Sequence, residues 1–483
     1  MVIDALKYQI LQQFGFVPTE EQGQALDAFA RFLTDRDLHA VMILRGSAGT
    51  GKTSLSGAIV RTLKAIRQKV MLLAPTGRAA KVFSLNSGCP AYTIHRRIYR
   101  EKSFAGVDGQ FNLNDNLFTD TLFMVDEASM ISNLGLGGGN FGSGCLLDDL
   151  VRFVYQGHND RLMLIGDKAQ LPPVGEEESP ALNRMMLEGY GLKVYECDLN
   201  EVLRQSQESG ILYNATVIRQ MITHDDITQL PLIRFKGFAD IVMMPGNELV
   251  ESLANSYYRV GQDETMVITR SNKRANIYNN GIRNMVLDRE EELSCGDMLM
   301  IVKNNYFWTE KEKNEAKEAL NAIPPFLANG DRAKVLRVSR HMELYGFRFA
   351  TLLLQFPDYD NYEMSVTALL DTLQSEAPAL THEQQEQLFH GVEEDYQDVP
   401  LKSDRMKAIR GDQYFNALQV KYAYAITCHK AQGGQWEHVY VDQGYMTDNM
   451  LTPDYIHWLY TAFTRAKDKL FLVNWPKTQT EQA

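Results

Sequence analysis

The chain has 483 residues, more than one ordinary hydrophobic core accommodates, so about two to four domains are expected. It contains no apolar run long enough for a transmembrane helix, no signal-peptide pattern at its N-terminus, and no C-x-x-C pair among its five cysteines, which together favour a reducing cytoplasm without a zinc site. The net charge of −12 does not exclude a nucleic-acid partner, because residues 357–400 alone hold 11 Asp or Glu and no Lys or Arg.

A glycine-rich loop follows the first apolar run, Val41–Leu44, and precedes a helical segment, Ser54–Ile66. Strand, glycine loop and helix in this order form the setting of a phosphate-binding P-loop. Glycines let backbone N–H groups close around phosphate oxygens, and the helix start adds partial positive charge. Lys52 is placed to reach the outer phosphates and Thr53 to bind Mg²⁺. The sequence therefore predicts a nucleoside triphosphate site formed by Gly46, Ser47, Ala48, Gly49, Thr50, Gly51, Lys52 and Thr53.

Three more apolar runs predict strands of the same α/β domain, with functional loops at their carboxyl ends: Val70–Leu73, Leu122–Val125 and Leu162–Ile165. After the second of these runs, Asp126 can hold Mg²⁺ and Glu127 can polarise a water, unless the two are ordinary exposed acids. After the third, Gln170 can contact the γ-phosphate or the attacking water, but a proline-stiffened turn explains that segment equally well.

Between these strands, the dipeptide Asp108-Gly109 predicts a hairpin turn flanked by Phe104 and Phe111. Further along the chain, Arg204 and Arg465 are candidate arginine fingers. An arginine acting on the γ-phosphate contributes roughly 10³–10⁵ in rate, although a lone arginine is usually a solvated surface group.

A second group of apolar runs predicts a second α/β domain: Met266–Ile268, Tyr422–Ile426, Val439–Val441 and Leu470–Val473. Its pattern is interrupted between about residues 296 and 420, which indicates an inserted subdomain. Within the acidic segment 357–400, Leu369, Leu370 and Leu373 fit one helical face and residues 384–389 another. This segment is either a solvated helical elaboration or a surface for a protein partner.

Taken together, the motifs resemble those of superfamily 1 helicases, and the variants of two motifs are most similar to the RecD-like and Dda-like branch. The resemblance spans about residues 14 to 475 and rests on nine motifs in order: Gln22 in PTEEQGQAL, GSAGTGKT, APTGRAA, YTIH, DEAS, GDKAQLPPV, LRQ, TCHKAQG and YTAFTRA.

The resemblance implies two RecA-like P-loop NTPase domains, with a small hairpin insertion in the first and an SH3-like β-barrel insertion in the second. The implied limits are 1–225 for the first domain, with the hairpin at about 98–120, then 226–295 plus 411–483 for the second, and 296–410 for the barrel with its acidic elaboration. ATP and Mg²⁺ are the implied cofactors, and Thr53 and Asp126 the implied Mg²⁺ ligands.

Site roles follow from the same resemblance. Gln22 reads the adenine, and Lys52, Thr53, Asp126, Glu127, Gln170, Arg204 and Arg465 serve ATP hydrolysis. Gly433 and Gln435 complete the ATP site, although many relatives carry Glu where Gln435 stands, and that Glu can bond the ribose. Single-stranded DNA is contacted by Pro75, Thr76, Arg78, Thr93, His95, Thr427, His429 and Lys430.

In this branch the hairpin is a pin that splits the duplex, here with Phe111 or Phe104 at the junction, unless both rings pack on their own domain. The sequence thus predicts an ATP-dependent DNA helicase that moves 5′-to-3′ on single strands and opens duplex junctions. The alternatives are a DNA-stimulated motor subunit of a larger repair complex and an RNA remodeller. A protein partner at 357–400 is an open expectation, and no membrane partner is expected.

Overall fold

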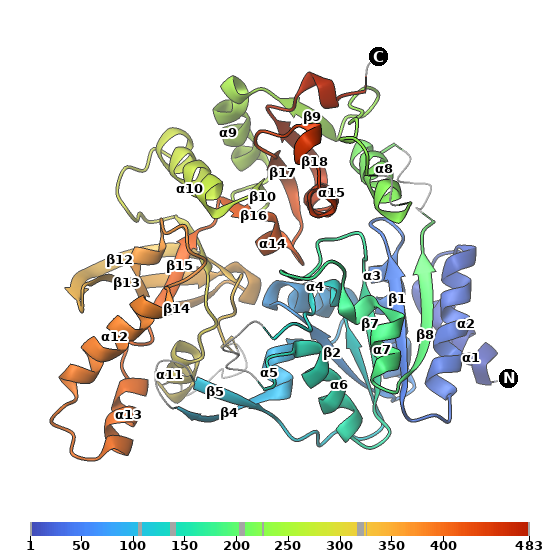
Figure 1. Cartoon of the computed structure of the whole chain (residues 1–483), viewed down its shortest axis with the longest axis horizontal. Coiled ribbons are helices and arrows are strands. Elements are labelled where there is room, and N and C mark those ends of the chain that lie inside the picture. The colour runs from blue at the N-terminus through green and yellow to red at the C-terminus, as the bar shows by residue number, and fades with distance from the viewer. Residues whose placement is uncertain are drawn as a thin grey trace.

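The computed structural model describes residues 2–104, 109–135, 142–201, 208–224, 227–315, 323–324 and 326–481. The chain forms two parallel sheets, a two-stranded hairpin and a closed five-stranded barrel. Figure 1 shows helices packed around the two sheets. This arrangement confirms the predicted fold class. Within the described ranges, no helix combines the length and apolar character needed to cross a bilayer.

The first sheet contains six parallel strands in the order β3-β2-β6-β7-β1-β8. The four apolar runs predicted in this half of the chain all form strands of this sheet. Its strands are β1 (Ala40–Gly46), β2 (Lys69–Ala74), β3 (Ala91–Thr93), β6 (Thr121–Val125), β7 (Arg161–Gly166) and β8 (Lys193–Leu199).

Helices cover both faces of this sheet, so its central strands are buried on both sides. Met42 and Leu44 of β1 pack with α1, α2 and α3, whereas Val41 and Ile43 pack with α5 and α6. This alternation follows from the two-residue period of a strand. The helices are α1 (Val2–Phe14), α2 (Glu20–Thr34), α3 (Lys52–Ala65), α4 (Gly77–Ser87), α5 (Ile94–Ile98), α6 (Leu146–Gln156) and α7 (Arg184–Gly189).

The second sheet has five parallel strands in the order β16-β10-β17-β18-β9. The strands are β9 (Ile241–Met244), β10 (Thr265–Thr269), β16 (Ala425–Thr427), β17 (Trp436–Asp442) and β18 (Ala466–Val473). The helices of this part are α8 (Gly210–Thr223), α9 (Leu249–Arg259), α10 (Asn272–Gly281), α14 (Cys428–Ala431) and α15 (Pro453–Phe463).

The run Tyr422–Ile426, predicted as one strand, is divided between two sheets. Tyr422 ends the barrel strand β15, and β16 of the second sheet starts at Ala425. The Asn279 side chain accepts hydrogen bonds from the N–H groups of Tyr424, at 3.0 Å, and Ala425, at 2.8 Å. The apolar pattern is continuous because both strands are buried, so the sequence gives no sign of the break.

The barrel lies between the two parts of the second sheet in sequence and closes in the order β11-β12-β13-β14-β15. Its strands are β11 (Met298–Ile301), β12 (Arg332–Leu344), β13 (Phe347–Phe356), β14 (Tyr362–Leu369) and β15 (Leu418–Tyr422), and its helices are α11 (Phe307–Glu315), α12 (His382–Asp395) and α13 (Lys402–Arg410). The closing strand β15 therefore follows residue 410, our predicted end of the insertion.

The acidic segment 357–400 is partly strand and partly helix. Leu369 ends β14 and Leu370 starts a short 3-10 turn, so the helical face predicted for Leu369, Leu370 and Leu373 is wrong. The second predicted helix is present as α12, whose Leu388, Phe389 and Val392 pack on the barrel through Phe347 and Phe349. The segment is anchored to the barrel by these apolar contacts.

The predicted hairpin forms from β4 (Tyr99–Phe104) and β5 (Gly109–Leu113), which pair antiparallel. Phe104 lies opposite Gly109, and Phe111 lies opposite Glu101. The turn residue Asp108 lies outside the described residues. The hairpin extends from the end of α5, on the side of the molecule where the barrel helix α11 is drawn (Figure 1).

Candidate nucleotide cleft and nucleic-acid groove

The predicted phosphate loop joins β1 to α3 in a conformation that needs glycine at several positions. Gly49 and Gly51 have φ angles of 78° and 81°, in the left-handed region. A Cβ built on Gly46 would come within 2.8 Å of Thr50 Oγ1 and of the Lys52 side chain. The loop backbone is therefore packed tightly against its own lysine, as a phosphate cradle requires.

Lys52 is held at the mouth of this loop. Its ammonium group donates to the carbonyl oxygen of Gly46 and, at 3.1 Å, to that of Ser47. Thr53, next along α3, has an exposed side chain. The positions of both residues fit the predicted contacts with outer phosphates and Mg²⁺.

Gln22 connects α2 to the loop. Its side-chain NH₂ group donates to the Thr50 carbonyl at 2.9 Å, and its Oε1 accepts from the Thr19 N–H at 3.0 Å. The second bond is half of a capping box that starts α2. Gln22 thus fixes the start of α2 beside the phosphate loop, and its contact with adenine stays a prediction.

The acid pair Asp126 and Glu127 lies directly after β6, beside the end of β2. Asp126 Oδ1 accepts the Glu127 N–H at 2.9 Å, and Glu127 has a φ of 53°. Burial, followed by the neighbouring Glu127 charge, raises the pKa of Asp126. Glu127 Oε2 is buried and has no hydrogen-bond partner among the described residues. A desolvated carboxylate and an unsatisfied oxygen at a strand end suit a divalent cation and an oriented water.

Gln170 lies on the loop after β7, between the two sheets. The N–H of the next residue, Leu171, donates to Thr461 Oγ1 at 2.8 Å, and the Leu171 carbonyl accepts from Gln432 Nε2 at 2.7 Å. Gln170 itself is 7% exposed, and within the part of the chain that the structure describes its Oε1 has no hydrogen-bond partner. The loop therefore links the first sheet to α15 and α14, with one amide oxygen free to bond a ligand.

Arg465 follows α15, but its guanidinium group is turned toward its own part of the molecule. It donates to the carbonyls of Thr461 and Gly434, at 3.0 and 3.1 Å, and to Thr464 Oγ1 at 3.0 Å. The side chain is 3% exposed. A finger role therefore requires these bonds to break. Arg204 lies outside the described residues.

Tyr460, on α15, is a functional candidate that the sequence analysis did not single out. Its hydroxyl accepts the N–H of the P-loop residue Ala48 at 3.0 Å and donates to Asp167 Oδ2 at 2.7 Å. The residue stands in the YTAFTRA motif, five positions before Arg465, so the motif was the available signal. One buried hydroxyl thus joins the P-loop, the loop after β7 and α15.

Three threonines predicted to contact DNA stand at the carboxyl ends of strands. Thr76 caps α4 by accepting the Ala79 N–H at 3.2 Å, and Thr93 caps α5 by accepting the Arg96 N–H at 3.4 Å. Thr427 precedes α14. Thr93 pairs with Ala74, next to Pro75, so these residues of the first sheet are neighbours. Such loop positions suit contacts with phosphates and sugars, which position a strand without reading its sequence.

Arg78, Thr76 and Lys430 meet in a cavity where the first sheet, the second sheet and the barrel converge. The other residues lining it include Met300, Gly330 and Arg332 of the barrel and Ile426, Gln432 and Trp436 of the second sheet. Arg78 stacks over Trp436 at 4.5 Å and donates to the Gln435 carbonyl at 2.9 Å. Arg78 therefore also connects α4 to the second sheet through these two contacts.

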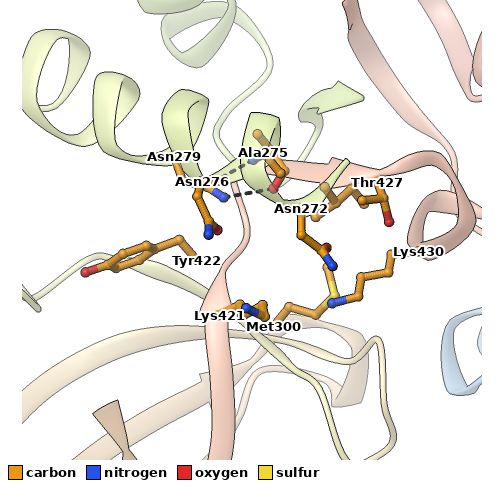
Figure 2. Close-up of a pocket in the computed structure, with 11 residues that line it drawn as sticks. Asn272, Ala275, Asn276, Asn279, Met300, Lys421, Tyr422, Thr427 and Lys430 are labelled. Atoms are coloured by element: carbon orange, nitrogen blue, oxygen red, sulfur yellow. Dashed lines mark hydrogen bonds between the residues drawn. The ribbon is translucent and has the colours of Figure 1, made fainter. Parts of the chain in front are cut away.

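A second cavity shares the lining residues Met300, Ile426 and Lys430 with the first. Figure 2 shows Lys430 extending toward Met300 and Lys421, with Asn272 and Thr427 beside it. Lys421, on the barrel strand β15, has no helicase-motif signal, and the sequence analysis missed it. Amides and cations line the two cavities, with residues from all three units, and the pair of cavities is termed the groove.

The pKa values of the two groove lysines, Lys421 and Lys430, are set mainly by burial. Among the described residues, no carboxylate forms an ion pair with either lysine. Burial lowers the pKa of Lys430 to about 8, and burial followed by the charge of Lys430 lowers the pKa of Lys421 to about 8. Packing around the imidazole lowers the pKa of His95 to about 4, so this ring is neutral at physiological pH. His429 is exposed on α14. The two lysines would gain most from an anionic ligand.

Gly433 and Gln435, predicted for the ATP site, contact α4 and the end of α15. Gly433 has a φ of 72°, and a Cβ there would lie 3.2 Å from Thr76 Oγ1. The Gln435 side chain reaches the Thr464 carbonyl at 3.5 Å. Both residues therefore lie at the junction of α4 with the second sheet, and their contact with nucleotide stays a prediction.

Among the described residues, no group of three or more His, Cys, Asp or Glu side chains could hold a metal ion. A Mg²⁺ held by Thr53 and Asp126 needs no such cluster, because phosphate oxygens and waters supply the other ligands.

Comparison with known proteins gives matches on both sheets. Residues 19–220 match the family model of an AAA domain, and residues 422–473 match that of the UvrD-like helicase C-terminal domain. The first range covers α2 to α8, and the second runs from the end of β15 to the end of β18.

Two curated relatives match part of the chain. The ATP-dependent RecD2 DNA helicase of Deinococcus radiodurans is 31% identical over 157 residues, which is 32% of this chain and 18% of that protein. The uncharacterized protein MJ1519 of Methanocaldococcus jannaschii is 33% identical over 171 residues, 33% of this chain and 14% of that protein. The matches thus span less than a fifth of either relative.

Among solved structures, a Pif1 helicase from Bacteroides in complex with ADP-AlF3 and single-stranded DNA aligns with a TM-score of 0.47 at 13% identity. The alignment covers 97% of this chain and 95% of that one.

Proposed function

We propose that this chain is a superfamily 1 helicase of the RecD-like branch, which uses ATP to move 5′-to-3′ along single-stranded DNA and to unwind duplex DNA. One observation carries this proposal: the contacts between the two sheets join the nucleotide cleft to the groove. Tyr460 and Thr461 of α15 bind the P-loop and the loop after β7, while Gly433 and Gln435 contact α4.

The P-loop residues fit a nucleoside triphosphate bound with Mg²⁺. The loop offers backbone N–H groups at left-handed glycines and the ammonium of Lys52. Thr53 and Asp126 would hold Mg²⁺, which neutralises phosphate charge during phosphoryl transfer. Glu127, with its unpartnered Oε2, would orient the attacking water, and Gln170 Oε1 would bond a phosphate or that water.

Movement would follow from changes at the sheet-to-sheet contacts. The Gln432 side chain bonds the Leu171 carbonyl beside the nucleotide cleft, while its near neighbour Lys430 lines the groove. A shift of α14 relative to the first sheet therefore alters both sites at once. Thr76 and Thr93 would hold the strand on the first sheet, and Thr427 and Lys430 would hold it on the second. Alternate release by the two sheets would move the strand.

The hairpin would act where the duplex enters. Opening one base-pair step costs about 1.4 kcal/mol on average, so directional stepping plus a wedge is energetically sufficient. A ring of Phe111 or Phe104 would stack on the exposed base pair, worth about 1–3 kcal/mol per stacked base. Also part of this proposal are the domain limits, with α8 reassigned to the second domain and β15 to the barrel, the finger roles of Arg204 and Arg465, and a role in recombination, repair or replication.

A second candidate is a DNA-stimulated motor subunit of a larger complex. It is favoured by α12, whose apolar face is anchored to the barrel while most of its acidic side chains remain exposed. Such a face would repel DNA and suit a basic protein surface. The isolated chain would then hydrolyse ATP on DNA without robust unwinding.

To test the proposed function, ATP turnover is measured alone, with single-stranded DNA, and with an RNA oligomer of equal length. Unwinding of duplexes with a 5′ or a 3′ tail follows. DNA-stimulated turnover with unwinding of the 5′-tailed duplex supports the proposal. Turnover without unwinding favours the motor subunit, and equal or greater stimulation by RNA contradicts the DNA assignment.

A further inference from the structure

Helix α8 presents one arginine to the phosphate loop from the side of the second sheet. Ile211, Ala215 and Ile218 of this helix are buried in the core that also contains the second sheet. Their spacing of four and three residues places them on one helical face. Arg219 follows Ile218 and is half-buried at the edge of that face, so its backbone is attached to the core of the second sheet.

The Arg219 guanidinium group contacts the P-loop directly. Its Nη1 donates to Ser47 Oγ at 3.0 Å and to Asn200 Oδ1 at 3.2 Å. The carbonyl oxygen of the same Ser47 accepts from the Lys52 ammonium at 3.1 Å. Two cations, one from each side of the cleft, therefore converge on one P-loop residue.

Neither contact of Arg219 is with an acid. In the described part of the chain, no carboxylate forms an ion pair with Arg219, and its partners Ser47 and Asn200 are neutral. Two like charges held near one another repel, and a polyanion between them would relieve that repulsion. A planar guanidinium group also matches phosphate oxygens through paired N–H donors.

Arg465, a predicted arginine finger, has different partners from Arg219. The guanidinium of Arg465 is satisfied by two carbonyls and a hydroxyl of its own part of the molecule. Arg219 already touches the loop that surrounds the phosphates, whereas Arg465 must first leave its partners. Tyr460 of α15 bonds Ala48 and Arg219 of α8 bonds Ser47, so the two helices contact consecutive P-loop residues.

We propose that Arg219 is a nucleotide-binding residue that contacts the terminal phosphate of ATP and thereby reports ATP rather than ADP to the second sheet. This inference rests on the proposed ATP site. Ser47 and Asn200 hold the guanidinium group at the phosphate loop. Because α8 is attached to the core of the second sheet, binding energy gained only with ATP favours one arrangement of the two sheets over the other.

The test compares the affinities for ADP and for a non-hydrolysable ATP analogue in R219Q, R219K and the full-length wild type. R219Q keeps hydrogen-bonding capacity but loses the charge, and we expect an affinity loss of about tenfold for the ATP analogue. ADP affinity should change less than about twofold, since ADP lacks the contacted phosphate. R219K should lie between R219Q and wild type. R152Q, which removes an exposed arginine of α6, is the matched control.

A residue that merely joins the sheets would give a different result. Equal loss of ADP and ATP-analogue affinity in R219Q would overturn the proposal, and so would unchanged affinities for both. Recovery of turnover in R219A by added guanidinium ions would support the phosphate contact. The affinity ratio does not depend on turnover. A wild type without turnover would refute the proposed function, and Arg219 would still be upheld if its preference for the ATP analogue over ADP were lost in R219Q.

Discussion

The nucleotide cleft and the nucleic-acid groove are built on opposite principles. The cleft is formed largely by one continuous loop, with acids at Asp126 and Glu127 balancing Lys52. The groove collects cations from separate units, Lys430 from α14 and Lys421 from the barrel, and burial lowers the pKa of both. A compact ligand that always binds in the same way suits the first design, whereas a polyanion that slides suits the second.

The largest expected effect is a loss of ATP turnover in the cleft while DNA binding in the groove is retained. K52A should reduce ATP turnover by at least about a hundredfold, because the cation at the outer phosphates is lost. Affinity for single-stranded DNA should change little. The measurement is steady-state turnover together with DNA binding by fluorescence anisotropy.

The matched control for this variant is K64A, which removes an exposed lysine from the last turn of the same helix. It should keep normal turnover. Near-normal turnover in a folded K52A protein would refute the ATP-site assignment.

A substitution in the groove should instead lower the affinity for DNA. K430M should lower affinity for single-stranded DNA by about tenfold at low salt and reduce the slope of log affinity against log salt by about one. The physical reason is the loss of one phosphate contact and of its released counterion. The loss should be similar for oligomers of different base sequence.

K402M, which removes an exposed lysine at the start of α13, serves as the control for this change. A loss confined to one base sequence, or an unchanged salt slope in K430M, would contradict phosphate binding in the groove.

Raising the pH should lower DNA affinity by less than the K430M substitution does. Because burial lowers the folded-state pKa of Lys421 and Lys430 to about 8, both lose their charge as pH rises through that value. DNA affinity should therefore be highest below pH 8 and fall several-fold between about pH 7 and pH 9. Anisotropy titrations at constant ionic strength measure this effect.

The double variant K421M/K430M should bind more weakly at pH 7 and show a flatter pH profile. If its profile kept the wild-type steepness, other groups would be responsible for the titration.

The smallest expected effect concerns the hairpin, which would convert ATP turnover in the cleft and movement along the groove into strand separation. F111A should lower the unwinding rate of a 5′-tailed duplex by a few-fold, by removing a stacking contact of about 1–3 kcal/mol. DNA-stimulated turnover should stay close to wild type, because the hairpin and the P-loop lie on different elements. The informative quantity is unwinding rate divided by turnover rate.

F104A provides the comparison within the same hairpin, since Phe104 is the less favoured wedge. Equal loss of unwinding and turnover in F111A would mean that this ring packs in the first domain. An unchanged ratio would mean that another element separates the strands.

Contiguous features of the sequence predicted the strands of the first sheet and the left-handed glycines of the loop between β1 and α3. The glycine loop, the acid pair and the buried strands before them act over a few residues, and their backbone geometry follows from local sterics and burial. The strand β8 went unnoticed because its residues are mostly half-exposed at the edge of the sheet, which weakens the apolar pattern. The division of Tyr422–Ile426 was missed because both pieces are apolar.

By itself, the sequence determined a P-loop site with its acids, two α/β units, an inserted hairpin and an inserted barrel. Only the tertiary structure decided which side chains from distant segments share a site. It turned Arg465 toward its own carbonyls, brought Arg219 and Tyr460 to the P-loop, and placed Lys421 beside Lys430. These contacts join residues far apart in the chain, and their geometry depends on how whole elements pack, which no local pattern encodes.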